Sequence, residues 1–209
     1  MPGRPVVRPV AALALLLAAA APLRAQPVQE AARPPDWPCV QVYVPELSPG
    51  LLWSGPDPEA VEPRWRDDAA VRRAAALATA PGATASAAAF DEAVAAVAES
   101  AGAERNQALT ALFAAVYETQ AARRREALQV IGRYARQQDA LHAAIARTLA
   151  TLDTAPPGSA EAATAEQALQ WQRRILDDRR RALEAVCEQP VLVEQRLGIL
   201  TRTIAARLD

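Results

Sequence analysis

The distribution of proline constrains the fold of this chain more than any other feature. Thirteen of the 17 prolines lie in residues 1–63, and residues 83–155 contain none. Proline breaks helix interiors because it lacks an amide hydrogen and clashes with the preceding turn. Alanine, the strongest helix former, supplies 52 of the 209 residues, and only 4% are aromatic. We therefore expect an irregular N-terminal part and a helical body, and a β-sandwich or barrel is disfavoured.

The first 25 residues have the pattern of an export signal. Arg4 and Arg8 precede an apolar run, residues 10–21, which is too short to cross a bilayer and is followed by the expected cleavage point after Ala25. This leader has no twin-arginine pair, and no small-residue lipid-attachment box precedes Cys39. We expect Sec-dependent export without lipidation to the periplasm, with secretion as the alternative, and no transmembrane segment.

Export changes the meaning of the only two cysteines. In an oxidising compartment an even number of cysteines predicts a disulfide. We therefore expect Cys39 to pair with Cys187, which would staple the N-terminal part of the chain to the helical body. The alternative is two unrelated thiols.

Turn signals divide the body into helices. Pro81-Gly82 and Pro156-Pro157-Gly158 mark the two strongest turns. The predicted helices cover residues 59–79, 86–100, 104–152, 160–188 and 191–207. The two longer patterns, after residue 127 and after residue 160, repeat apolar residues at alternating steps of three and four, as in a coiled coil.

These patterns predict an all-α fold built on a long antiparallel, coiled-coil-like helical hairpin. Two shorter helices cover it, its second arm is kinked or broken at Pro190, and the alternative is a chain that folds back there into a compact bundle. If the turn centres near Pro156, Cys187 lies opposite Arg124 and Trp171 opposite residues 140–141. The expected organisation is a cleaved signal (1–25), an extended arm rich in Pro and Trp (26–57) and a helical domain (58–209).

The arm and the start of the helical domain concentrate the aromatic residues. Two interpretations follow for Trp37, Tyr43, Trp53 and Trp65. In the first, the arm is an ordered segment that buries these side chains against the helices. In the second, they form a contact surface for a partner, because Trp and Tyr are favoured interface anchors and extended segments can pair with a sheet edge.

Few residues offer chemistry. His142 is the only histidine, so a di-iron or zinc site lacks ligands, and we expect no metal or cofactor. No Gly-x-Ser-x-Gly turn or glycine-rich phosphate loop is present. His142 and Trp171 are candidates to line an apolar pocket between the helices.

Charge disfavours nucleic acid as a partner. All 23 basic residues are arginine, and without the three in the leader, 20 basic residues face 24 acidic ones, a net charge of −4. Proteins that neutralise phosphates need a positive surplus. We therefore expect a non-enzymatic exported protein that acts by protein contact, as a scaffold, adaptor or chaperone-like factor with an unknown partner, and the helical seams also allow a homodimer. The alternatives are a small-ligand-binding bundle and an unrecognised enzyme.

Overall fold

The computed structural model of the chain describes residues 33–80 and 86–209, and every regular element in this part is helical. The expected export signal, residues 1–25, lies outside the described residues. In chain order the elements are α1 (Pro49–Leu52), the 3-10 turn η1 (Pro58–Ala60), α2 (Pro63–Arg66), α3 (Ala69–Thr79), α4 (Ala87–Ala101), the 3-10 turn η2 (Gly102–Glu104), α5 (Arg105–Thr154) and α6 (Ala160–Ala205). The all-α prediction is confirmed for this part of the chain.

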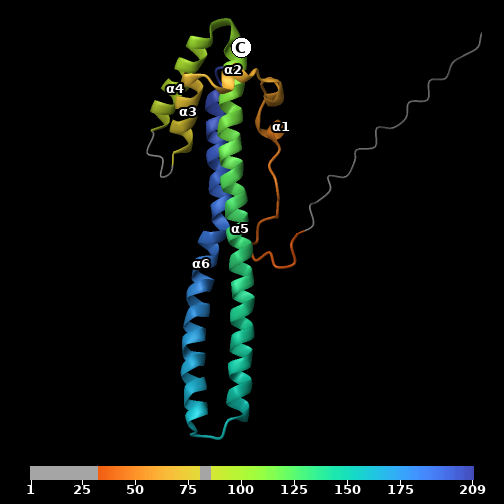
Figure 1. Cartoon of the computed structure of the whole chain (residues 1–209), viewed down its shortest axis with the longest axis vertical. Helices are drawn as coiled ribbons and strands as arrows, with labels where there is room; N and C mark the ends of the chain where they lie inside the picture. Colours follow the sequence, from red (N-terminus) through yellow and green to blue (C-terminus); the bar gives the residue numbers. More distant parts are fainter. Residues whose placement is uncertain (1–32, 81–85) are drawn as a thin grey trace, which may run out of the picture. The chain divides into compact units, whose positions relative to one another are not determined.

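Helices α5 and α6 dominate the structure, with 50 and 46 residues, and they lie side by side in opposite directions (Figure 1). At 1.5 Å per residue they are about 75 and about 69 Å long. The connection between them includes Gly158, whose φ of 76° lies in the left-handed region that glycine adopts without strain. Ser159 then begins α6 by accepting a hydrogen bond from the amide of Ala162.

Side-chain hydrogen bonds fix the register of the two long helices. Near the turn, Gln172 Nε2 donates to Thr148 Oγ1 at 3.0 Å. The predicted position of Trp171, opposite residues 140–141, is therefore wrong, because its neighbour Gln172 contacts α5 two turns closer to the connection. Counting outward from the turn assumed that both helices start level, whereas α6 is offset along α5.

The same offset corrects the position of the second cysteine. Arg124 pairs with Glu194, Nε to Oε1 at 2.5 Å, and not with the turn of α6 that carries Cys187. Cys187 instead packs beside Ile131. The predicted pairing took Pro156 as the centre of a connection that actually spans residues 155–159.

Helix α6 continues through Pro190. Of the outcomes predicted there, the break between residues 160–188 and 191–207 is wrong, as is the alternative of a chain that folds back, whereas a kink is compatible with the continuous helix. The axis of α6 bends part way along its length (Figure 1), as expected for a helix that contains proline. The helix persists because Leu197 and Ile204, beyond the proline, are fully buried. Burial of two large apolar side chains stabilises by about 3–6 kcal/mol, which offsets the roughly 3 kcal/mol that an interior proline costs.

The predicted helix at residues 59–79 is divided into η1, α2 and α3. Pro63 occupies the first turn of α2, where its missing amide hydrogen is not needed. Asp68 then starts α3 afresh, because its carboxylate accepts hydrogen bonds from the amides of Ala70 and Val71. The sequence pattern identified the apolar face of this segment but not its internal caps.

The main core lies where α3 and α4 pack against the first half of α5 and the last turns of α6. On the two shorter helices, Phe90, Val94 and Val97 are buried, and Leu77 is half-buried. Leu109, Leu112 and Phe113 are the largest α5 contributions and are completely enclosed. This core joins elements that are about 100 residues apart in the chain.

The described part of the arm, residues 33–57, lies along the helices and is held at two points. At the first, Cys39 and Cys187 form a buried disulfide with a Cα–Cα distance of 5.7 Å. Trp37 packs on this disulfide and on Ile131, and the edge of Tyr43 meets the Trp37 ring at a centroid distance of 5.0 Å. The structure thus joins the cysteines whose pairing the sequence suggested.

The second attachment joins the arm to the main core. The Trp53 ring stacks on Phe113, with centroids 4.4 Å apart and planes 8° from parallel, and its Nε1 donates to the Pro56 carbonyl. Between the two attachments, the buried Arg124 donates to the Pro45 carbonyl as well as to Glu194. The arm is therefore part of the folded structure over most of its described length.

We predict that Trp53→Ala lowers the free energy of unfolding by about 3–5 kcal/mol, because it removes a large buried ring and leaves a cavity over Phe113. Urea denaturation followed by circular dichroism measures the change. Leu51→Ala is the control, since that side chain is 88% exposed, and it should change stability by no more than about 0.5 kcal/mol. Equal losses in the two variants would contradict the packing described for the arm.

Candidate functional site

The structure separates the four aromatic residues that the sequence proposed as a contact surface. Trp37 and Tyr43 lie together at the disulfide, whereas Trp53 and Trp65 belong to the main core. Trp37 and Trp53 are each only 7% exposed, and the other two are half-buried. Their placement agrees with the interpretation of the arm as a segment that buries its aromatic side chains.

The arm instead exposes aliphatic side chains. From residue 40 to residue 47 exposure alternates, with the odd-numbered side chains partly covered and the even-numbered ones facing solvent. Val40 and Val42 are 101% and 70% exposed, and Leu51 in α1 is 88% exposed. This segment therefore alternates as an extended chain does, and its valines point away from the helices.

The proposed pocket pair, His142 and Trp171, lies on the surface. His142 is exposed, and Trp171 contacts Arg174, whose guanidinium carbon is 5.3 Å from the ring centroid. Neither residue lines the main hollows of the described part of the chain, which lie beside the arm and between α6 and the α3–α4 pair. The ligand pocket predicted at His142 and Trp171 therefore stays a prediction.

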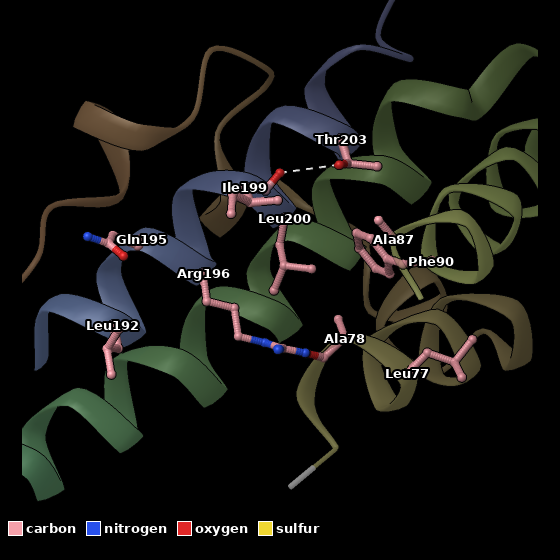
Figure 2. Close-up of a pocket in the computed structure, with 10 residues that line it drawn as sticks. All are labelled: Leu77, Ala78, Ala87, Phe90, Leu192, Gln195, Arg196, Ile199, Leu200 and Thr203. Atoms are coloured by element: carbon pink, nitrogen blue, oxygen red, sulfur yellow. Dashed lines mark hydrogen bonds between the residues drawn. The ribbon is translucent and has the colours of Figure 1, made fainter. Parts of the chain in front are cut away.

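A groove of about 320 Å³ opens between α6 and the α3–α4 pair, and its walls are mainly apolar (Figure 2). Phe90 of α4 and Leu200 of α6 form its floor, and both are buried. Leu77 of α3 lies at one side. The remaining lining residues are Ala78, Ala87, Leu192, Gln195, Arg196, Ile199 and Thr203.

Two exposed apolar side chains border this groove on α6. Leu192 is 45% exposed and Ile199 is 55% exposed. They are seven residues apart, which is two helical turns, so they lie on the same face of α6. A face that presents large apolar side chains to solvent beside an apolar groove is characteristic of a binding surface.

Arginines fix the wall of the groove. Arg196 of α6 reaches across to α3 and donates to the Ala78 carbonyl at 2.9 Å (Figure 2). Arg123 of α5 donates to the next carbonyl, that of Thr79. These are carbonyls of the last turn of α3, which lack partners within the helix and carry the negative end of its dipole. The two guanidinium groups therefore position α3 relative to the long helices.

Two further hollows lie along the arm, and charged side chains border both. One, of about 580 Å³, lies between the arm and α5 and includes Trp37, Arg125, Gly132 and Arg136. The other, of about 590 Å³, runs beside the disulfide and includes Arg180. Arg136 approaches Asp36 of the arm at 4.0 Å, so part of this positive charge is balanced within the chain.

Few groups have a perturbed proton affinity. Burial raises the pKa of the Tyr117 hydroxyl, and the Glu46 carboxylate raises it further. This hydroxyl donates to the Leu47 carbonyl and so attaches the arm to α5. We therefore assign the Tyr117 hydroxyl a structural role in holding the arm.

No group of three or more His, Cys, Asp or Glu side chains within residues 33–80 and 86–209 is arranged to hold a metal ion. In the same ranges, no helix has an apolar stretch long enough to cross a membrane.

Sequence reasoning missed the groove. The apolar spacing of the last predicted helix indicates a single apolar face, to which the buried Leu197, Leu200 and Ile204 belong. Leu192 and Ile199 form a second apolar stripe on this helix, seven residues apart. A search of the sequence for two apolar stripes on one helix could have found it. The groove itself also needs α3 and α4, whose positions the sequence does not give.

Comparison of the chain with known protein families, with characterised proteins and with solved structures finds no match.

We predict that Arg196→Met lowers the free energy of unfolding by about 1–2 kcal/mol, because it leaves the Ala78 carbonyl without its charged donor but keeps an apolar stem of similar length. Thermal unfolding measures the effect. Arg202→Met, at an exposed position of the same helix, is the control and should stay within about 0.5 kcal/mol of the original protein. If both variants unfold like the original, the contact between Arg196 and α3 does not hold the groove together.

Proposed function

We propose that this chain is an exported, non-enzymatic helical protein that binds another polypeptide, and that the groove between α3, α4 and α6 receives an amphipathic helix of the partner. The observation that carries the proposal is the pair Leu192 and Ile199, large apolar side chains that stay about half exposed beside an apolar floor. Leaving such side chains in water costs free energy that a partner would recover by covering them.

The lining of the groove favours a helix as the bound element. Helix-in-groove recognition uses apolar anchors spaced over two turns, and the two exposed α6 side chains supply a matching two-turn repeat. Gln195, Arg196 and Thr203 add polar groups around the apolar floor formed by Phe90 and Leu200. An amphipathic helix would place its apolar face on the floor and its polar flanks against these groups.

Export remains part of the proposal. It is supported by the leader pattern in residues 1–25 and by the buried Cys39–Cys187 disulfide, since disulfides persist in oxidising compartments. The periplasm is the proposed compartment, with secretion as the alternative. Both modes of binding a partner there fit the proposal: stable binding, as by a scaffold or adaptor, and transient binding, as by a chaperone.

We predict that a labelled peptide whose leucines form one face of a helix binds the protein, and that Ile199→Asp weakens the binding by about tenfold or more, because a buried charge would face the apolar surface. Fluorescence anisotropy measures the affinity. Leu51→Asp is the matched control, because that leucine is 88% exposed on α1, outside the groove, and it should bind like the original protein. Equal binding of a scrambled peptide, or no effect of Ile199→Asp, would refute the groove as the binding site.

The compartment has its own test. We predict that protein recovered from the exported fraction lacks residues 1–25 and has no free thiol, because its two cysteines are joined. Intact mass measured after alkylation, with and without reduction, shows both features. Two alkylated cysteines in unreduced exported protein, or an uncleaved product in the cytosol, would overturn the assignment.

A further inference from the structure

The part of the hairpin near the α5–α6 turn is incompletely covered. We call this part the free half and define it as residues 136–154 of α5 and 160–186 of α6. In α5, 13 residues between Ala108 and Ala135 are buried, but none from Arg136 to Thr154. In α6, only Ala162, Ala165 and Leu169 are buried before Cys187. Figure 1 shows that, among the described elements, α1 to α4 lie along the other half.

Large apolar side chains in the free half remain in contact with water. Trp171 and Ile175 are 56% and 45% exposed, and Leu149 on α5 is 45% exposed. Trp171 and Ile175 are four residues apart and thus share one face of α6. Two helices alone cannot enclose an apolar stripe, and stable helical architectures bury such stripes against further helices.

The charge of the free half changes sign along its length. Residues 148–172, which surround the turn, contain Asp153, Glu161 and Glu166 but no arginine. The remaining residues of the free half, 136–147 and 173–186, together contain seven arginines, three aspartates and one glutamate. The net charges of the two regions are therefore −3 and +3.

The sign changes at the same level on both helices. On α5 the boundary falls between Arg147 and Thr148, and on α6 between Gln172 and Arg173. The hydrogen bond from Gln172 to Thr148 joins the two boundaries directly. Trp171 and Ile175 lie on either side of this level, so the exposed apolar face is centred on the change of sign.

We propose that the free half binds a second copy of this chain, side by side and antiparallel, around a twofold axis at the level of Trp171 and Ile175. In this arrangement the acidic turn region of each copy lies against the basic region of the other, and the exposed apolar side chains meet at the centre. The four helices form an antiparallel bundle, and the symmetric contact closes on itself as a dimer. A parallel arrangement would instead place like charges together.

Sedimentation velocity of the oxidised protein tests the dimer. The original protein should form dimers, and Trp171→Glu should raise the dissociation constant by at least about tenfold, because Trp anchors are typical hot spots and a buried carboxylate is costly. Val42→Glu, at a 70% exposed position on the arm, is the control and should dimerise normally. Circular dichroism verifies that each variant is folded.

Charge reversal tests the antiparallel orientation. Asp153→Arg/Glu166→Arg makes the turn region positive, and Arg173→Glu/Arg180→Glu reduces the positive charge of the basic region; all four side chains are exposed. Each double variant alone should dimerise more weakly than the original protein, and a mixture of the two should form a mixed dimer. The original dimer should also weaken as salt is raised, because exposed charges are screened.

A monomeric original protein at all concentrations, or an unchanged dissociation constant for Trp171→Glu, would overturn the dimer. Failure of the two charge variants to associate when mixed would overturn the antiparallel orientation. These outcomes are separate from those of the groove, since Ile199 lies beyond the free half: Ile199→Asp should leave dimerisation unchanged, and Trp171→Glu should leave peptide binding unchanged.

Discussion

Burial of one side of α5 between Ala108 and Ala135 is the interaction on which the rest of the structure depends. This stretch receives α3 and α4, the last turns of α6 and the arm, and it contributes the completely enclosed side chains Leu109, Leu112 and Phe113. Because the covering elements come from both ends of the chain, their burial sets the position of nearly every other described segment. It also allows α6 to continue through Pro190, since the apolar residues beyond the proline pack into the same core.

The same dependence explains why side chains are well buried along one half of the hairpin and poorly buried along the other. Where α5 has neighbours on several sides, it carries a continuous core and an ion pair between the buried Arg124 and the partly exposed Glu194. Where only α6 accompanies α5, the residues between the two helices are partly exposed. There the helices are also joined by side-chain hydrogen bonds, such as that from Gln172 to Thr148. The groove and the free half are thus both places where packing stops short of covering an apolar surface, one at each end of the long helices.

The sequence predicted the elements better than their arrangement. Proline and glycine positions located α4, α5 and the turn before α6 to within about two residues. The break at Pro190 was wrong because a local rule on proline was applied without the packing that overrides it, and the register was wrong because spacing along one helix carries no information about the offset between two. Of the residues proposed for function, Trp37 and Trp53 proved to be buried anchors of the arm, while the groove residues Leu192 and Ile199 were not selected.

The sequence by itself determined that the described part of this chain is helical, where α5 begins and ends, where α6 begins, and which two cysteines can pair, because backbone preferences and the number of cysteines are local properties. Only the tertiary structure decided which apolar side chains are enclosed and which remain in water. Exposure depends on what packs against a residue from distant parts of the chain, and Leu192 and Leu197, five residues apart on one helix, differ only in that respect.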